Sequence, residues 1–574
     1  MDVPAHNPLK PLPPTFRELF TPKLVTLLRE GYRARDFTAD AFAGLTVAIV
    51  ALPLAMAIAV ASGLSPEKGL YTAIIGGFLI SALGGSRFQI GGPAGAFIVL
   101  IAAIVERHGY DGLVLATAMA GLMMTAAGFL RLGTYVKYIP LPVTIGFTAG
   151  IAVIILASQL KELLGLDMTK EPSALAPKLA AIWDALGTIN PAALAVSIGS
   201  VAIIVGLRRF RPRWPGMLIA VTGTAAFVAA VGLDVATIGS RFGDVPRTLP
   251  LPSLPEFDLA KVRAVFPDAL AIALLGAIES LLSAVVADGM SGRKHRSNCE
   301  LVAQGVANVA SVTFGGMCAT GTIARTATNV RAGAISPVSG MLHAVYLLLF
   351  LLVAAPLAAY VPLASLGGVL VVVAWNMAEK EEFAGLLRAS WGDATVLMVT
   401  FLLTIFEDLT IAIAVGVTLG AFLFMHRMAE NVEVATGSHL VAEDEADATG
   451  AERTGYEPAQ YGSDVVVYRI SGAFFFAATA SVHSALDRIG ERPRVFILDF
   501  SDVPLVDSTA AKSLEGFARK LERAGTHVYF AAARRSVRRT LARAGLRPPL
   551  VAYTPSVIEA LKMAQVESAP RSAP

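Results

Sequence analysis

The chain has 574 residues, of which 55% are hydrophobic and only 16% are charged. A soluble protein carries about 25% charged residues, so much of this chain is expected to lie inside a membrane, where charge is costly. The formal net charge of +3 is too small to indicate a nucleic-acid partner.

The N-terminal residues 1–36 are polar and rich in proline, with no cleavable signal peptide before the apolar part of the chain. They are predicted to form a cytoplasmic segment that leads into a transmembrane domain over residues 37–428. A spanning helix needs ~20 mostly apolar residues, and about fourteen apolar segments, several of them short, are predicted. They cover residues 41–63, 69–83, a segment from 93, 113–130, 143–160, 191–207, 216–233, 268–287, 301–314, 320–330, 337–361, 363–377, 394–406 and 409–425.

Basic residues gather after the even-numbered segments, and the positive-inside rule places such ends in the cytoplasm. Both termini of this multi-pass membrane protein are therefore predicted to be cytoplasmic. The residues concerned are Arg87 after segment two, Arg131 and Lys137 after four, Arg208, Arg209, Arg211 and Arg213 after six, Arg293, Lys294 and Arg296 after eight, and Arg427 after fourteen.

The third and tenth segments each follow a glycine-rich stretch, residues 91–96 and 315–322. Because they are seven segments apart, an odd number, the two halves (about residues 37–233 and 266–428) would be inverted relative to each other. In inverted-repeat transporters, short Gly- or Pro-interrupted segments at matching positions mark the substrate site. A half-helix that begins at mid-membrane offers free N–H groups and the positive end of its dipole to an anion, and Pro93 suits an early helical position. The alternative is that these glycines only allow close helix packing.

Two isolated charges lie in the same half of the chain. Arg325 would cost at least ~2.5–3.5 kcal/mol at membrane depth, so it is predicted to be a second positive element beside the anion, unless it snorkels to the interface. Burial favours the neutral form of a carboxyl group, so Glu279 is predicted to bind and release a proton. It could equally hold Na⁺ together with Ser283, one turn further on, or be a structural carboxylate paired with Arg325 or a backbone N–H. Asp288 and Glu300 are interpreted as ordinary boundary charges.

The two cysteines, Cys299 and Cys318, lack the spacing of metal ligands, so neither a disulfide framework nor a zinc site is indicated. No metal and no cofactor are predicted. Since no nucleophile–base pair or phosphate loop stands out either, the chain is predicted not to be an enzyme.

A change in composition follows residue 428. Residues 429–462 are acidic and are predicted to form a linker and surface loop, followed by a soluble α/β domain over residues 463–565 and a disordered tail over 566–574. The predicted strands cover residues 465–470, 494–500 and 527–532, and the predicted helices 478–489, 510–524 and 536–544.

The chain resembles the sulfate permease (SulP) family of anion transporters over nearly its whole length. The motifs are DAFAGLTV (40–47), LPLAMA (52–57), GLY (69–71), PVTIGFTAG (142–150), QL (159–160), ES (279–280), NCEL (298–301), GVAN (305–308) and RTA (325–327). The resemblance implies fourteen helices in two inverted repeats, a core and a gate domain, and elevator-like alternating access. It places the anion between segments one, three, eight and ten, and the predicted substrate-binding residues are Leu54, Pro93, Ala94, Gly95, Gly321, Thr322 and Arg325.

Within that family, Leu54 and Ile58 stand where many sulfate-transporting members carry Gln and Tyr. The chain looks most like the C4-dicarboxylate transporter (DauA-type) branch, and Glu279 stands where sodium-coupled bicarbonate carriers bear Asp. The resemblance therefore implies H⁺ symport of succinate, fumarate or aspartate. The alternatives are a sulfate or bicarbonate transporter or exchanger, coupled to Na⁺ or uncoupled, and a membrane sensor that acts through its soluble domain.

The C-terminal region is similar to a STAS domain, the module shared with anti-sigma-factor antagonists, through the sequences LDF (498–500) and VDST (506–509). In the antagonists a hydroxyl residue at this turn is phosphorylated, and the matching position is Thr509. The simpler interpretation is that Ser508 or Thr509 caps the following helix. The resemblance also implies a homodimer, a cytoplasmic protein partner of the STAS domain, and membrane lipid around the helices.

Overall fold

A computed structural model describes residues 15–168, 172, 174–211, 214–253, 258–407, 409–430, 433–436, 465–475 and 493–568. The chain divides into two compact units, Met1–Gly420 and Ala421–Pro574. Each unit is described by itself.

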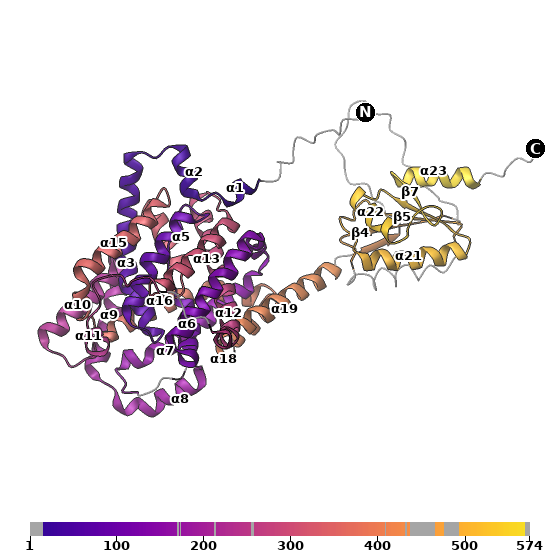
Figure 1. The fold of residues 1–574 in the computed structure, drawn as a ribbon. Coiled ribbons are helices and arrows are strands. Elements are labelled where there is room, and N and C mark those ends of the chain that lie inside the picture. The colour runs from indigo at the N-terminus through magenta and orange to yellow at the C-terminus, as the bar shows by residue number, and fades with distance from the viewer. Residues whose placement is uncertain are drawn as a thin grey trace, which may run out of the picture. The chain divides into compact units, whose positions relative to one another are not determined.

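The first unit is a bundle of helices (Figure 1). Its elements are α1 (Phe16–Phe20), α2 (Lys23–Glu30), α3 (Ala34–Ala61), α4 (Pro66–Tyr71), a π-helical turn (Thr72–Gly76), α5 (Gly77–Leu83), β1 (Gly91–Gly92), a 3₁₀ turn (Gly95–Phe97), α6 (Ile98–Phe129), a 3₁₀ stretch (Leu132–Tyr138), α7 (Leu141–Leu164), α8 (Leu175–Ala185), a 3₁₀ turn (Leu186–Thr188), α9 (Pro191–Phe210), α10 (Gly216–Val231), α11 (Ile238–Phe242), α12 (Leu259–Ser291), α13 (Ser297–Thr313), β2 (Thr320–Gly321), α14 (Ile323–Arg331), α15 (Val338–Ala358), α16 (Leu363–Met377), α17 (Lys380–Ala389) and α18 (Trp391–Phe406), and α19 (Leu409–Glu430) leads into the second unit.

Each predicted apolar segment coincides with helical structure. The second consists of α4, the π-helical turn and α5 in succession, and the third and fourth together form α6, which breaks at Gly109 (φ 68°, ψ −176°). Over the described ranges, eight helices are long and apolar enough to cross a membrane, and α10 and α18 are shorter apolar helices. The fold is therefore that of a helical, multi-pass membrane protein.

The helices pack closely where small residues meet. At the crossing of α6 and α13, a Cβ added to Gly121 would lie 2.6 Å from the carbonyl oxygen of Gly305, and a Cβ on Gly305 would overlap the backbone of α6. Such contacts between backbones are how helices associate in a membrane. Some of the glycines are therefore explained by packing alone.

The structure adds helices that the hydropathy pattern did not predict: α1, α2, α8, α11 and α17. The N-terminal helices are joined to the bundle through Asp40, which is fully buried near the start of α3. Its carboxylate accepts hydrogen bonds from the Tyr32 hydroxyl (2.7 Å), the backbone N–H of Ile335 (2.8 Å) and Ser336. A buried carboxylate needs such partners.

The second unit contains a five-stranded sheet in the order β3–β4–β5–β6–β7. Its strands are β3 (Glu433–Thr436), β4 (Val465–Ser471), β5 (Val495–Asp499), β6 (His527–Ala531) and β7 (Ala552–Thr554); β3 is antiparallel to β4 and the other pairs are parallel. Helices α21 (Ser508–Arg523) and α22 (Arg535–Arg543) share one apolar core with the sheet, and α23 (Val557–Ser568) shares a second.

All three predicted strands of this unit are present. The structure differs from the prediction at β3, which lies inside the predicted linker and pairs with β4. The predicted helix 478–489, most of the linker and most of the tail lie outside the described residues.

Candidate anion-binding site

The two glycine-rich stretches meet in a short antiparallel ladder. Gly91 pairs with Gly321 and Gly92 with Thr320, and the N–H of Thr322 donates to the carbonyl of Ile90 at 3.0 Å. One strand comes from each half of the transmembrane unit. The ladder therefore holds the beginnings of α6 and α14 side by side.

A helical segment begins directly after each strand. Ala94 and Thr322 are the N-terminal cap residues; both have extended backbone, and neither end has a side-chain cap. The first-turn N–H groups of a helix have no partner within the helix, so these two ends present hydrogen-bond donors and positive partial charge.

Pro93 is not an early helical residue, so that prediction is wrong. It precedes the cap residue Ala94, and the helical segment begins at Gly95. The role of Pro93 in the structure is as an acceptor, because its carbonyl oxygen lies 3.1 Å from Nη2 of Arg325.

Both helix beginnings line one cavity of about 280 Å³, formed by α3, α7, α10, α12, α14 and α16 together with the start of α6. Its wall is mostly apolar. Seven of the predicted site residues line it: Leu54, Pro93, Ala94, Gly95, Glu279, Thr322 and Arg325. They share this cavity with Val50, Ile58, Phe147, Thr148, Met217, Leu275, Ile278, Leu282, Ile323, Ala324, Thr328, Val373, Asn376, Met377 and Glu379, among others.

Two predicted residues are not among those that line the cavity. Gly321 belongs to β2, and the side-chain amide of Gln89 occupies the space where a Cβ at Gly321 would lie. Ser283 donates its hydroxyl to Oγ1 of Thr326 at 3.0 Å, so it links α12 to α14. The close approach of Gln89 accounts for a glycine at position 321, and the hydrogen bond to Thr326 accounts for Ser283. Neither residue needs a ligand to explain it.

Arg325 is buried, with only 1% of its surface exposed, so it does not snorkel to an interface. Its Nη2 bonds to Pro93, whereas Nε and Nη1 have no hydrogen-bond partner among the described residues. Gly92 makes room for this guanidinium, because a Cβ there would collide with Nη1. A buried cation with free donors is an expected anion contact.

Glu279 lines the cavity from α12 and is partly exposed to it. Its Oε2 is buried without a hydrogen-bond partner in the described part of the chain, and no ion pair joins Glu279 to Arg325 there. The neighbouring Ser280 fixes this turn, because its hydroxyl lies 2.6 Å from Oγ1 of Thr320 and accepts from the N–H of Gly321 at 3.2 Å. A carboxyl group in this setting is suited to holding a proton.

Three buried polar residues near the ladder were missed by the sequence reasoning. Gln89 and His343 each have both side-chain polar atoms unpaired within the described residues. Asn329 donates to the carbonyl of Phe88 and to the hydroxyl of Ser339, each at 2.9 Å. Two of them leave a signal in the sequence: Gln89 is a polar residue two positions before Gly91, and His343 is a lone histidine in an apolar segment.

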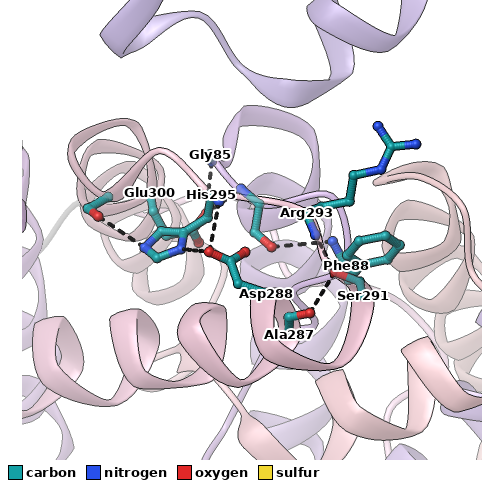
Figure 2. Close-up of polar contacts among 10 residues, drawn as sticks. Gly85, Phe88, Ala287, Asp288, Ser291, Arg293, His295 and Glu300 are labelled. Carbon is teal, nitrogen blue, oxygen red and sulfur yellow. Dashed lines mark hydrogen bonds and ion pairs between the residues drawn. The ribbon is translucent and has the colours of Figure 1, made fainter. Parts of the chain in front are cut away.

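A separate polar cluster lies between α12 and α13 (Figure 2). Asp288 accepts from the backbone N–H of His295 at 3.1 Å, and its Oδ2 lies 2.7 Å from the ring Nδ1 of the same histidine. Glu300 is fully buried and accepts from the N–H groups of Gly85 (2.8 Å) and Ser86 (3.1 Å). The prediction that Glu300 is an ordinary boundary charge is therefore wrong: it binds the loop between α5 and β1.

In the second unit, neither Ser508 nor Thr509 caps α21, so that interpretation is wrong. Asp507 is the cap, and its carboxylate accepts from the N–H of Ala510 at 2.8 Å. Ser508 and Thr509 are exposed in the first turn of the helix. Over the described ranges, no group of three or more His, Cys, Asp and Glu side chains is placed to hold a metal ion.

These features define a helical membrane transporter with a C-terminal α/β module. Residues 37–400 match the sulfate permease family and residues 458–560 match the STAS domain. The chain therefore belongs to the sulfate permease family, a family of transporters and not of enzymes, and it is an anion transporter with a C-terminal STAS domain.

The chain is similar to "Putative sulfate transporter YvdB" of Bacillus subtilis, with 43% identity over 86% of this chain and 91% of the relative. It is 31% identical to the bicarbonate transporter BicA of Synechocystis, over 88% of this chain and 90% of that one. Among solved structures, murine Slc26a9, an anion transporter in the inward-facing state, has a TM-score of 0.83 at 18% identity, covering 98% of this chain and 97% of that chain. This last likeness supports the fold alone.

Proposed function

We propose that the chain is a secondary active transporter that binds a small anion in the cavity between the starts of α6 and α14 and moves it together with a proton on Glu279. One observation carries the proposal: two uncapped helix ends converge on one cavity with donors of Arg325 and a carboxyl oxygen of Glu279 that have no hydrogen-bond partner among the described residues. Backbone N–H groups at helix N-termini bind anions in many proteins.

The position of this cavity supports alternating access. Its lining extends along α3 from Ile58 to Val50 and along α16 to Met377, towards the ends that the positive-inside rule predicts to be cytoplasmic. A second cavity of about 360 Å³ is lined by the next turn of α3, including Ala57 and Val60. A substrate site at the interface of two inverted repeats is the arrangement from which alternating access proceeds.

The apolar wall supports a substrate with a hydrocarbon body. Leu54, Ile58, Phe147 and Leu275 line the cavity beside the helix ends, and apolar contacts of this kind stabilise carbon atoms but not a sulfate ion. The proposed substrates are C4-dicarboxylates such as succinate, fumarate and aspartate. Sulfate and bicarbonate form the second candidate, because relatives at 43% and 31% identity carry those names.

Proton coupling is favoured over sodium coupling. Cation sites of this kind are built from several oxygen ligands, and Ser283, the expected second ligand, is not among the residues that line the cavity. A single buried carboxyl group can carry a proton without further ligands. An uncoupled exchanger on the same scaffold would move anions without a change in internal pH.

In this proposal the chain works as a homodimer in a bacterial inner membrane with both termini in the cytoplasm. The STAS domain regulates transport, with Ser508 and Thr509 exposed for modification and a cytoplasmic protein as its partner. Removal of the residues after 430 separates this role from a sensor function: regulation is lost and transport remains if the proposal is right, whereas a sensor would show no transport in either form.

The direct test is uptake into proteoliposomes with a panel of dicarboxylates, sulfate and bicarbonate. An inward proton gradient is expected to drive accumulation of a dicarboxylate and to alkalinise the outside. If only sulfate or bicarbonate accumulated, the assignment of dicarboxylates as substrates would be wrong. A flux that does not change with the proton gradient would show that transport is not coupled to protons.

A further inference from the structure

The STAS domain carries an arginine-rich face on α22 and the turn that follows it. Six arginines make up this arginine face, and all of them are exposed. They are Arg534, Arg535, Arg538, Arg539, Arg543 and Arg547.

The helix geometry gathers Arg535, Arg539 and Arg543 on one side of α22. Val537 and Leu541 are the buried residues of α22, and at 3.6 residues per turn they lie on the face opposite Arg535 and Arg539. Arginines at such spacing are neighbours on the surface, and like charges held together repel. The apolar side of α22 is explained by the core; the arginine face is not.

Nothing acidic in the described residues neutralises this face. No described carboxylate lies within ion-pair distance of any of the six arginines, whereas Arg469, Lys512 and Arg519 of this unit do form ion pairs. The sequence contains no Asp or Glu between Glu522 and Glu559. The guanidinium of Arg538 lies over the ring of Tyr553 at 4.7 Å, which leaves its charge uncompensated.

The choice of arginine indicates the chemistry of the partner. Every basic residue from Arg534 to Arg547 is an arginine, and the planar guanidinium binds phosphate oxygens through two parallel hydrogen bonds, which lysine cannot do. Clusters of four to eight basic residues on a helix next to a membrane bind anionic lipid headgroups.

The chain connectivity keeps the STAS domain near a surface of lipid headgroups. The apolar span of α19 ends at Met428 and β3 begins at Glu433, so the STAS domain is tethered close to the end of a membrane helix. A short tether makes the lipid surface locally concentrated and favours it over soluble polyanions. We propose that the arginine face of α22 docks on the anionic phospholipid headgroups of the membrane in which the chain sits.

The test uses the full-length protein in nanodiscs. A fluorophore is attached to the cysteine of a Ser536→Cys variant, because Ser536 is exposed on α22. The native Cys299 and Cys318 are buried, so they should not be labelled. Lipids with a nitroxide on the headgroup quench the fluorophore on contact. Strong quenching is expected in phosphatidylglycerol discs and weak quenching in phosphatidylcholine discs, and at about 1 M salt, where the screening length falls to about 3 Å, quenching should be lost.

Matched variants decide whether the arginine face is responsible. Each headgroup contact is worth about fivefold in the docking constant, so the Arg535→Gln/Arg539→Gln pair should weaken docking about 25-fold. The Lys520→Gln/Arg523→Gln pair on exposed positions of α21 removes the same charge and should change docking little. Equal losses in both pairs would reduce the effect to overall charge and overturn the proposal.

Two other outcomes would also overturn it. Quenching that is the same in neutral and anionic discs would exclude headgroup recognition. A fluorophore that ignores lipid charge but responds to soluble polyglutamate or RNA would assign the arginine face to a soluble acidic partner instead.

Discussion

Replacement of Arg325 by alanine should weaken anion binding more than any other single truncation in the cavity. The guanidinium is buried, its Nη2 is used by Pro93, and Nε and Nη1 remain free within the described residues. A hydrogen bond between charged partners contributes about 1.5–3 kcal/mol. Since 1.4 kcal/mol is tenfold in affinity, the loss of one such bond raises KM about 10- to 100-fold.

The assay is initial-rate uptake of the best substrate into proteoliposomes over a wide concentration range. Arg331→Ala is the matched control, because Arg331 lies in the last turn of the same helix and is exposed. Arg325→Lys keeps the positive charge but loses the planar set of guanidinium donors, so its KM should lie between those of the wild type and Arg325→Ala. An unchanged KM in Arg325→Ala, or the same rise in Arg331→Ala, would refute the role of Arg325 in the site.

Three further predictions concern coupling, packing and the STAS domain. Glu279→Gln should abolish accumulation driven by a proton gradient while leaving the folded yield unchanged; retained proton-driven uptake would end the coupling hypothesis. Gly121→Ala should cost about 1–3 kcal/mol by overpacking against Gly305 and lower the melting temperature, whereas Gly199→Ala, which meets no atom within 4 Å, should not. Leu541→Ala in the STAS core should cost about 2–5 kcal/mol, measured by chemical denaturation; a loss under 1 kcal/mol would contradict the packing of this fully buried residue.

The positions of the two half-helices could be predicted because the signal is local. Short apolar segments after glycine-rich stretches, separated by an odd number of crossings, require an inverted arrangement, and the ladder between Gly91 and Gly321 brings them together. The long apolar runs were likewise sufficient to predict the eight described helices that are long and apolar enough to cross a membrane, since membrane helices are defined by composition along the chain.

The exact role of single polar residues could not be predicted, because it depends on partners far away in the sequence. Ser283 is engaged by Thr326, and Glu300 binds the backbone of Gly85 from a different helix. The cap of α21 falls on Asp507, one residue before the predicted candidates. For Ser283 and Glu300 the deciding contact is tertiary and leaves no mark on the local pattern. The cap of α21 is instead a local contact, from Asp507 to the N–H of Ala510 three residues further on.

The arrangement of Arg325 and Glu279 gives the proposed coupling a physical reason. One carboxylate of the substrate beside Arg325 and a proton on Glu279 leave neither of these two side chains with an uncompensated charge, and moving an uncompensated charge across a membrane is costly. The loaded site can then move with less penalty than the half-loaded one. The two residues come from α12 and α14 of the same half of the transmembrane unit.

The central claim is that the starts of α6 and α14 bind the anion. A cryo-electron microscopy reconstruction of the protein with saturating substrate tests it most directly. The account predicts density for the anion within hydrogen-bond distance of the backbone N–H groups that follow Ala94 and Thr322, and next to Arg325. Density elsewhere in the molecule, with the cavity free of ligand at saturation, would contradict the account.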